Sequence, residues 1–286
     1  MSSPQTCYAT HGPMTDPGLH ADLFNDLPAS VADLCRIVQG VMVHVFWAER
    51  YGLVVPEERK GELQTRPVER KLARIMELDD HPLTVERPLD RRLVGNCRDF
   101  ATLLCAMLRH QGVPARARCG FGTYFLPDHY EDHWVCEYWH AGESRWVTVD
   151  AQLDSFQQEA LHISFDTLDM PAGQFVTGGE AWQLCRAGET DPDAFGIFDM
   201  HGLWFVRGDL IRDVASLNKV ETLPWDVWGL IAGKDEEISE EDMQFLDHVA
   251  ALTMAGDEAI EELQTLYTSD DRLRILDDSD ILQTIS

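Results

Sequence analysis

The chain of 286 residues lacks long apolar runs, and no stretch comes near the roughly 18 consecutive apolar residues that predict a membrane-spanning helix. Its first twenty residues, MSSPQTCYATHGPMTDPGLH, contain no basic segment followed by an apolar one. A secretory signal peptide is therefore not predicted. We expect an intracellular, cytoplasmic protein that has no membrane partner.

Positive charge is also scarce, because 23 Lys and Arg residues stand against 50 Asp and Glu residues and give a net charge of −27. Such a surface repels the phosphates of nucleic acids and of anionic lipids, so neither is an expected partner. About half of the excess lies in residues 234–286, which hold 16 acidic and three basic residues. We interpret this segment as an acidic, solvated helical face.

The seven cysteines are odd in number and irregular in spacing, which is not typical of a disulfide framework. In a reducing compartment their thiols stay free, and one of them can serve as a nucleophile. The sequence offers no motif for a cofactor, and we predict none.

Apolar periodicity and turn residues predict a mixture of helices and strands along the chain. Helices are expected over 30–50 with Ser30 as the N-cap, over 66–78, over 96–112 with a stop at Gly112, and over 238–254 with a cap at Ser239. Strands are expected over 113–126, 132–140 and 144–150. Helices followed by an antiparallel sheet make an α+β fold.

The segment 204–231 permits two interpretations. Asp209, Arg212 and Asp213 could form a buried ion-pair network, but we favour a solvated surface for them. Trp225 and Trp228 could line a substrate pocket, but aromatic residues three apart more often belong to the core.

Cys97 lies at the start of the helix predicted over 96–112, after a glycine at position 95 that lets the backbone approach closely. Free N–H groups and the dipole at a helix N-terminus stabilise a thiolate, which is the nucleophilic form of cysteine. The same N–H groups could stabilise the oxyanion of a tetrahedral intermediate. Cys105, among Leu and Met residues in the middle of this helix, is instead expected to be a buried apolar side chain.

A cysteine nucleophile needs a base and a group that orients the base, and the predicted hairpin supplies both. A turn centred between Gly142 and Glu143 pairs residues whose numbers sum to 285. His133 and Asp150 then lie on the same face of the hairpin as diagonal neighbours, close enough for an imidazole–carboxylate hydrogen bond. This inference depends on the turn, because a slip of one residue would separate them.

The motifs around these residues resemble those of the transglutaminase-like superfamily, a branch of papain-like cysteine chemistry. The segments that carry the resemblance are GNCRDFATLLCAMLRHQGVPARARCGF, DHWVCEYW and RWVTVDAQLD. The resemblance implies that Cys97 is the nucleophile, His133 the base and Asp150 its orienting group. It also implies a core in which the helix that begins at the nucleophile packs on an antiparallel sheet, with extra helical flanks.

From the motifs we predict three regions: an N-terminal helical region (1–79), a transglutaminase-like catalytic core (80–165) and a C-terminal region packed on the core (166–286). The calcium sites and additional β-domains of the animal enzymes are not evident. Calcium dependence is therefore not predicted.

Three functions remain open at this point. The first, which we favour, is a cysteine-dependent enzyme that attacks a small-molecule or peptide amide or ester and hydrolyses it through a thioester; an amide-forming, transamidating acyltransferase is its variant. The second is a non-catalytic transglutaminase-like binding scaffold. The third is a metal site at His129, His133 and Cys136, which we disfavour because the last two residues would point to opposite faces of a strand.

Overall fold

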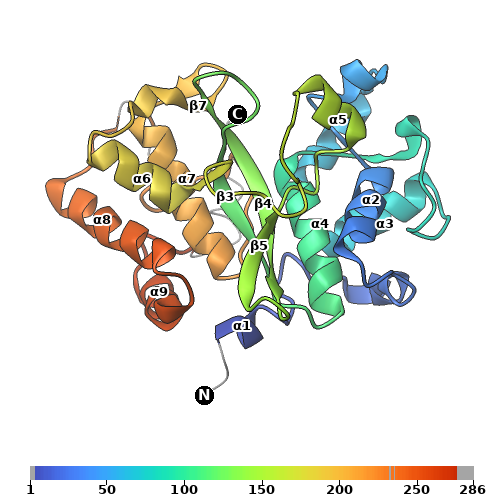
Figure 1. Ribbon diagram of the computed structural model, residues 1–286, viewed down its shortest axis with the longest axis horizontal. Coiled ribbons are helices and arrows are strands. Elements are labelled where there is room, and N and C mark those ends of the chain that lie inside the picture. The colour runs from blue at the N-terminus through green and yellow to red at the C-terminus, as the bar shows by residue number, and fades with distance from the viewer. Residues whose placement is uncertain (1–3, 232, 235, 276–286) are drawn as a thin grey trace. The chain divides into compact units, whose positions relative to one another are not determined.

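The computed structural model describes residues 4–231, 233–234 and 236–275, and it confirms a mixed α and β fold (Figure 1). The chain divides into two compact units. The Cys97 unit comprises Gln5–Ala117 and Val135–Pro171, and the His133 unit comprises Met1–Pro4, Arg118–Trp134 and Ala172–Ser286. Because both units draw on separated parts of the sequence, the three consecutive regions 1–79, 80–165 and 166–286 stay a prediction.

The Cys97 unit is built around α4, which runs from Cys97 to His110 and contacts α2 (Val31–Val41) and α3 (Val68–Leu78). These three helices lie close together in Figure 1. Every residue of α4 except the last is buried. The remaining helices of the unit are α5 (Ser155–Ala160) and the 3-10 helices η1 (Gly18–Phe24), η2 (Ala48–Tyr51), η3 (Glu57–Gln64) and η4 (Leu89–Arg91), while α1 (Pro4–Cys7) begins at the unit boundary.

The helix expected over 30–50 is shorter than predicted. Its cap is confirmed, because the Ser30 side chain accepts a hydrogen bond from the backbone N–H of Asp33. The helix ends at Val41, however, and the next residues form β1 (Met42–His44), which pairs in parallel with β2 (Leu93–Gly95). The run VMVHV contains three β-branched residues, which favour an extended backbone once a partner strand is available.

The predicted strands are present as β3 (Ala115–Gly122), β4 (Tyr130–His140) and β5 (Arg145–Val149). The β4–β5 pairing begins with Cys136 opposite Val149 and ends with His140 opposite Arg145. The residue numbers of each pair sum to 285, which confirms the hairpin register expected from the sequence. Strands β3 and β4 each pass from one unit into the other.

In the His133 unit the strand order is β6-β3-β4-β7-β8, with β6 (Phe175–Thr177), β7 (Phe195–Ile197) and β8 (Met200–His201). The helices of this unit are α6 (Gly178–Arg186), α7 (Leu203–Leu217), α8 (Glu240–Met254) and α9 (Ile260–Ser269), with the 3-10 helices η5 (Pro192–Ala194) and η6 (Gly256–Glu258). Helix α6 contacts α7 and α8, and α8 contacts α9.

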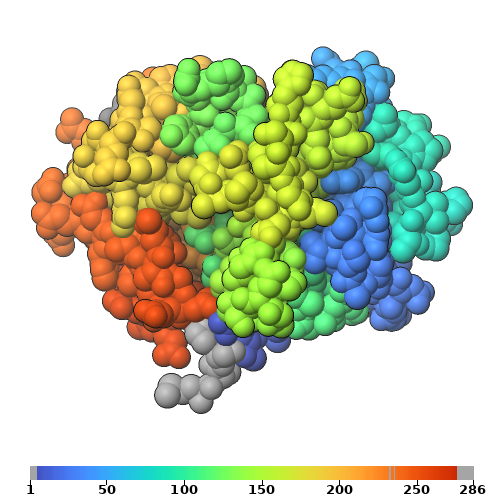
Figure 2. Space-filling view, in the orientation of Figure 1, coloured from blue at the N-terminus to red at the C-terminus, as the bar shows by residue number. Residues whose placement is uncertain are grey.

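Helix α8 starts as predicted, because the Ser239 hydroxyl accepts a hydrogen bond from the N–H of Asp242. Acidic residues of α8 and α9, including Glu240 and Glu261, are exposed, and both helices contribute to the surface in Figure 2. In the part of the chain that the structure describes, no helix is both long and apolar enough to cross a membrane.

The expectation of a solvated surface at Asp209, Arg212 and Asp213 is wrong. All three residues are buried, and α7, which carries them, contacts α6, α8 and the strands β7 and β8. Arg212 pairs with Asp209 at 3.0 Å, and Arg118 of β3 binds Asp213 through two nitrogens at 2.9 and 2.8 Å. Each of the three residues therefore has a partner of opposite charge, but Asp209 Oδ2 and Arg212 Nε make no hydrogen bond with any described residue.

The tryptophans of the LPWDVWG segment belong mainly to the core. Trp228 is buried and donates a hydrogen bond from its indole N–H to the carbonyl of Leu273 at 2.8 Å. Trp225 is half-buried. The core assignment is thus confirmed for Trp228.

Candidate active site

Cys97 is the first residue of α4, directly after β2 and the N-cap Asn96. The Asn96 side chain accepts a hydrogen bond from the N–H of Asp99 at 3.3 Å, and Asp99 Oδ2 accepts one from the N–H of Asn96 at 3.0 Å. This capping box fixes the start of the helix at the cysteine. Cys97 itself is buried, with 8% of its surface exposed.

Two buried cations lie beside the carboxylate of Asp99 in the first turn of α4. Asp99 Oδ1 lies 2.5 Å from Lys71 Nζ and 3.1 Å from Arg98 Nη1. Burial alone would raise the pKa of Asp99, but the positive charges of Lys71 and Arg98 hold that pKa below its usual value. Two cations against one carboxylate leave a net positive charge at the start of α4, which favours an anion there.

Gly95 lies where side chains of β1 and of the first turn of α4 come close to the backbone. A Cβ atom at this position would lie 2.5 Å from Met42 Cε and 3.0 Å from Asp99 Oδ2. The sequence predicted a close approach at Gly95, and the structure identifies Met42 and Asp99 as the groups that approach it.

Asp150 follows β5 directly and is buried in the Cys97 unit. Its backbone N–H donates to the carbonyl of Thr167 at 2.9 Å, and its Oδ1 accepts a hydrogen bond from the N–H of Gln152 at 3.0 Å. Burial, together with the negative charge of Asp150, raises the pKa of Cys35 in α2 to about 12. Two hydrogen bonds therefore hold Asp150 in place, and its negative charge contributes to the raised pKa of Cys35.

A hydrogen-bond network beside Asp150 has no counterpart in the sequence analysis. Gln152 donates to Gln157 at 3.1 Å, Gln157 donates to the Tyr51 hydroxyl at 3.1 Å, and this hydroxyl donates to Asp154 Oδ2 at 2.7 Å. Burial and the bond to Asp154 raise the pKa of Tyr51. These four residues contribute to the lining of a cavity of about 10 Å³, which has room for about one water molecule.

His133 lies in the part of β4 that belongs to the His133 unit, and it is buried. The ring of Phe125 meets its imidazole edge-on at 4.9 Å between centroids, and the ring of Tyr124 does so at 6.0 Å. The two aromatic residues follow β3 and restrict the orientation of the imidazole.

The structure thus places two of the three predicted catalytic residues, Cys97 and Asp150, in the same unit, and the third, His133, in the other unit. The confirmed β4–β5 register runs from Cys136–Val149 to His140–Arg145 and includes neither His133 nor Asp150. Their assignment with Cys97 as a catalytic triad stays a prediction.

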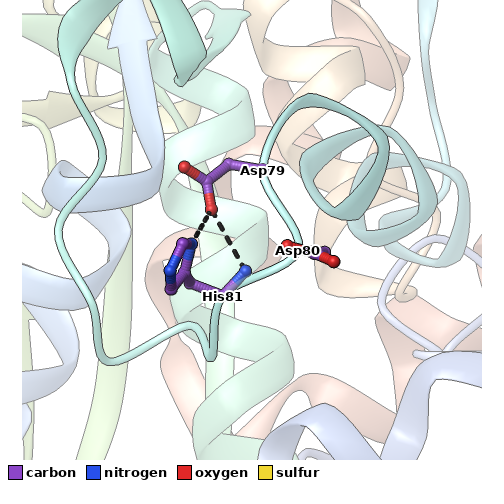
Figure 3. Close-up of side chains that lie close together, drawn as sticks. All are labelled: Asp79, Asp80 and His81. Atoms are coloured by element: carbon purple, nitrogen blue, oxygen red, sulfur yellow. Dashed lines mark hydrogen bonds and ion pairs between the residues drawn. The ribbon is translucent and has the colours of Figure 1, made fainter.

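Side chains of the types that bind metal ions lie close together at other places than the predicted catalytic residues. Among the described residues, two groups of three have potential ligand atoms close together: Asp79, Asp80 and His81 on the surface, and Cys119, Asp132 and Asp209 in the His133 unit. The disfavoured site at His129, His133 and Cys136 is neither of these. In the first group, Asp79 Oδ1 accepts a hydrogen bond from the backbone N–H of His81 at 3.1 Å and lies 2.6 Å from Nδ1 of the same residue. The two contacts form a local turn after α3 (Figure 3).

Burial raises the pKa of several other thiols. Cys105 and Cys136 lie 3.2 Å apart between their sulfur atoms, and burial together with Cys105 raises the pKa of Cys136 well above its usual value. Burial also raises the pKa of Cys119, and it raises that of Cys185 to about 12. The raised pKa values of Cys136, Cys119 and Cys185 disfavour the thiolate form at these three positions.

Comparison with known families matches residues 74–151 to the model of the transglutaminase-like superfamily. Residues 74–151 are therefore similar to the core of this superfamily. This finding confirms the resemblance inferred from the motifs, and the matched segment includes Cys97, His133 and Asp150. The remainder of the chain lies outside the match.

Comparison with solved structures found a likeness to "a Putative Cysteine Protease from Cytophaga hutchinsonii", with 15% identity and a TM-score of 0.38. The likeness covers 62% of this chain and 46% of that one, so it spans less than half of the solved structure. Comparison with curated proteins gave no match.

Proposed function

We propose that this protein is a cysteine-dependent enzyme that attacks an amide or ester through Cys97. The observation that carries the proposal is the position of Cys97 as the first residue of α4, inside the segment that matches the transglutaminase-like superfamily. The capping box fixes the thiol at the end of the helix where an anion is favoured. The net positive charge of the Lys71, Arg98 and Asp99 side chains acts in the same direction.

In the proposed reaction, His133 removes the proton of Cys97 and the sulfur attacks the carbonyl carbon of the substrate. A C–S bond forms, and the oxygen of the tetrahedral intermediate is stabilised by backbone N–H groups at the start of α4. The C–N or C–O bond then breaks, the leaving group takes the proton from His133, and the acyl group remains as a thioester.

Water completes the reaction in the favoured, hydrolytic form. His133 takes a proton from water, the resulting hydroxide attacks the thioester, and the acid leaves while Cys97 is regenerated as a thiolate. Asp150 orients the imidazole and stabilises its charged form. An amine in place of water would give a new amide, so the same residues would support transamidation.

The experiment that tests the proposal is turnover of a panel of activated esters and amides by the wild type, Cys97→Ala and Cys105→Ala. We expect leaving-group release by the wild type, loss of at least about 10³-fold in Cys97→Ala, and near wild-type rates in Cys105→Ala. Circular dichroism would check that both variants fold. Turnover that survives Cys97→Ala would contradict the proposal.

The acceptor is tested separately by adding a primary amine to the same assay. Formation of the free acid at an unchanged rate supports hydrolysis, whereas an amide product that increases with amine concentration supports acyl transfer. If the folded wild type releases no leaving group from any donor and Cys97 forms no thioester, the binding-scaffold alternative is favoured.

A further inference from the structure

A thiol and two carboxylates lie close together inside the His133 unit. Cys119 belongs to β3, Asp132 to the neighbouring strand β4 and Asp209 to α7. The sulfur atom of the cysteine and one carboxylate oxygen of each aspartate lie within 4.8 Å of one another. All three residues belong to the same compact unit. We call these three residues the Cys119 cluster.

Hydrogen bonds of neighbouring residues hold the cluster in place. Asp213 is one turn after Asp209 on α7, so the two side chains share a face of the helix. The Asp213 carboxylate accepts hydrogen bonds from the N–H of Cys119 at 3.0 Å and from the Arg118 guanidinium at 2.9 and 2.8 Å. Arg212 Nη1 donates to Oδ1 of Asp209 at 3.0 Å. These bonds tie β3 to α7 beside the cluster and orient one of its carboxylates, as a preorganised binding site requires.

Two carboxylate oxygens of the cluster make no hydrogen bond with any described residue. They are Oδ1 of Asp132 and Oδ2 of Asp209, and both atoms are buried. Asp209 as a whole is only 1% exposed. A buried polar atom without a partner is unfavourable, and a bound ion is one of the groups that satisfy such atoms. The two free oxygens therefore indicate a positively charged occupant.

The charges around the cluster do not balance. Arg118 is paired with Asp213, and Arg212 is paired with Asp209, which leaves the negative charge of Asp132 in excess. A buried excess charge is removed either by a proton or by a cation. Burial raises the pKa of Asp132 to about 6, so a proton is the competing occupant.

The thiol determines which cation suits the cluster. Zn²⁺ accepts thiolate sulfur together with carboxylate oxygen, whereas Mg²⁺ and Ca²⁺ take oxygen ligands. Tetrahedral Zn²⁺ with bonds of about 2.0–2.3 Å holds its ligand atoms about 3.5 Å apart. The three atoms of the cluster, which are at most 4.8 Å apart, have to approach by about 1.3 Å at most. Asp132 is half-buried whereas the other two residues are buried, so its side of the cluster gives access to an ion.

We propose that the Cys119 cluster binds one Zn²⁺ ion through the Cys119 thiolate and the carboxylates of Asp132 and Asp209. On binding, the S–H bond of Cys119 breaks, its proton passes to the solvent and a Zn–S bond forms. Coordination deprotonates a thiol outright, which offsets the effect of burial on the pKa of Cys119. A water molecule completes the tetrahedron. The ion links β3, β4 and α7, and so it stabilises the strand on which His133 follows Asp132.

The test measures Zn²⁺ uptake by full-length Cys97→Ala that has been treated with a chelator, because this background removes the thiol of the proposed nucleophile as a competing ligand. Equilibrium dialysis at micromolar free Zn²⁺, followed by elemental mass spectrometry, is expected to give one ion per chain. Co²⁺ in place of Zn²⁺ is expected to give the near-ultraviolet absorption band of a thiolate-to-cobalt charge transfer, which reports the sulfur ligand directly.

Two variants and a matched control, all made in the Cys97→Ala background, locate the ion. Cys119→Ser and Asp132→Asn are each expected to weaken Zn²⁺ binding at least about tenfold, and Cys119→Ser also removes the cobalt band. Asp132→Asn is the milder change, because Asp132 is half-buried. Cys185→Ser removes another thiol of the same unit and is expected to leave both readouts unchanged. Circular dichroism checks the fold of each variant.

A second readout uses stability. Zn²⁺ is expected to raise the Tm of the Cys97→Ala protein and of its Cys185→Ser variant, because an ion that binds only the folded chain stabilises it. The Tm of the Asp132→Asn variant is expected to stay the same with and without Zn²⁺. An equal rise in all three proteins would contradict the assignment.

The other results that overturn the inference are also defined. They are an absence of stoichiometric Zn²⁺ uptake, which leaves a proton as the occupant, and a cobalt adduct without the charge-transfer band. Uptake that survives Cys119→Ser and Asp132→Asn but is lost in His81→Ala would place the ion at the exposed group of Asp79, Asp80 and His81. None of these readouts depends on turnover, so the proposed function stands or falls separately.

Discussion

Helix α4 carries two cysteines whose surroundings differ completely. Cys97 is at its first residue, beside a capping box and the buried charges of Lys71, Arg98 and Asp99. Cys105 is two turns further along, has no exposed surface, and lies 3.2 Å from the sulfur of Cys136.

If Cys97 is the nucleophile, as proposed, then position on the helix, rather than residue type, decides which of the two thiols reacts. Free N–H groups and net positive charge at the start of α4 favour a thiolate. The middle of the helix is fully buried, so Cys105 is closed to solvent and to substrates. The predictions below would break or sharpen this contrast.

The largest effect is expected from removal of the base. If His133 activates Cys97, His133→Ala should lower kcat/KM by about 10³-fold or more, and Cys97→Ala/His133→Ala should lower it no further than Cys97→Ala alone, because the residues act as a unit. The measurement is kcat/KM for the best substrate of the panel. Additive losses in the double variant would show that the two residues act independently.

The next effect concerns the buried carboxylate of the first turn. Asp99→Asn leaves the cations of Lys71 and Arg98 without their anion, and we expect it to lower the free energy of unfolding by about 3–5 kcal/mol at pH 7. Urea denaturation of wild type and variant measures this difference. A loss below about 1 kcal/mol would mean that the three charges do not depend on one another.

The same pair of proteins gives a pH dependence with a defined sign. The pKa of Asp99 is lowered in the folded state from its usual value of 3.8, so its contribution to stability is complete above that value and is lost as the pH falls through the folded-state pKa. The gap between wild type and Asp99→Asn should therefore be constant between pH 5 and 7, on the basis of that usual value, and shrink in stronger acid. An equal gap at every pH would contradict this origin.

A smaller effect is expected at the N-cap. Asn96→Ala removes the side-chain acceptor for the N–H of Asp99 and should lower the free energy of unfolding by about 1–2 kcal/mol. Asn96→Ser keeps an acceptor, so its loss should be only a few tenths of a kcal/mol. Thermal denaturation of both variants provides the comparison. Equal losses would indicate that packing of Asn96, and not its capping bond, stabilises the helix start.

The smallest effect is expected from the second thiol. Cys105→Ala removes a buried sulfur from an apolar environment and should cost about 1 kcal/mol of stability. Turnover should remain within about twofold of the wild type, because the side chain has no part in the chemistry. A large loss of turnover with an intact fold would erase the contrast between the two positions.

The sequence was sufficient to predict α4 to within two residues at each end and the β4–β5 register, because apolar periodicity, capping residues and turn length are local signals. It was insufficient at α7, where the same charged residues suit either a solvated face or a covered one. The strands, α6 and α8 cover that helix, and their contacts with it are not encoded in its own periodicity.

The candidate site shows the same difference between local signals, which the sequence carries, and contacts between distant residues, which it does not. Cys97, His133 and Asp150 could be selected from motifs and spacing. The hydrogen-bond network of Gln152, Gln157, Tyr51 and Asp154 could not be predicted, because Tyr51 is about a hundred residues from its partners and nothing in the local sequence connects them. Likewise, the pairing of His44 with Gly95 required β1, which the sequence had assigned to a helix.

The most direct test of the central claim is competitive alkylation of the native protein by limiting iodoacetamide at neutral pH, with each of the seven cysteines quantified by mass spectrometry. The account predicts that Cys97 reacts first, despite being buried, and at least tenfold faster than Cys105 on the same helix. Equal reactivity of Cys97 and Cys105, or preferential reaction at the half-buried Cys7 or Cys185, would contradict it.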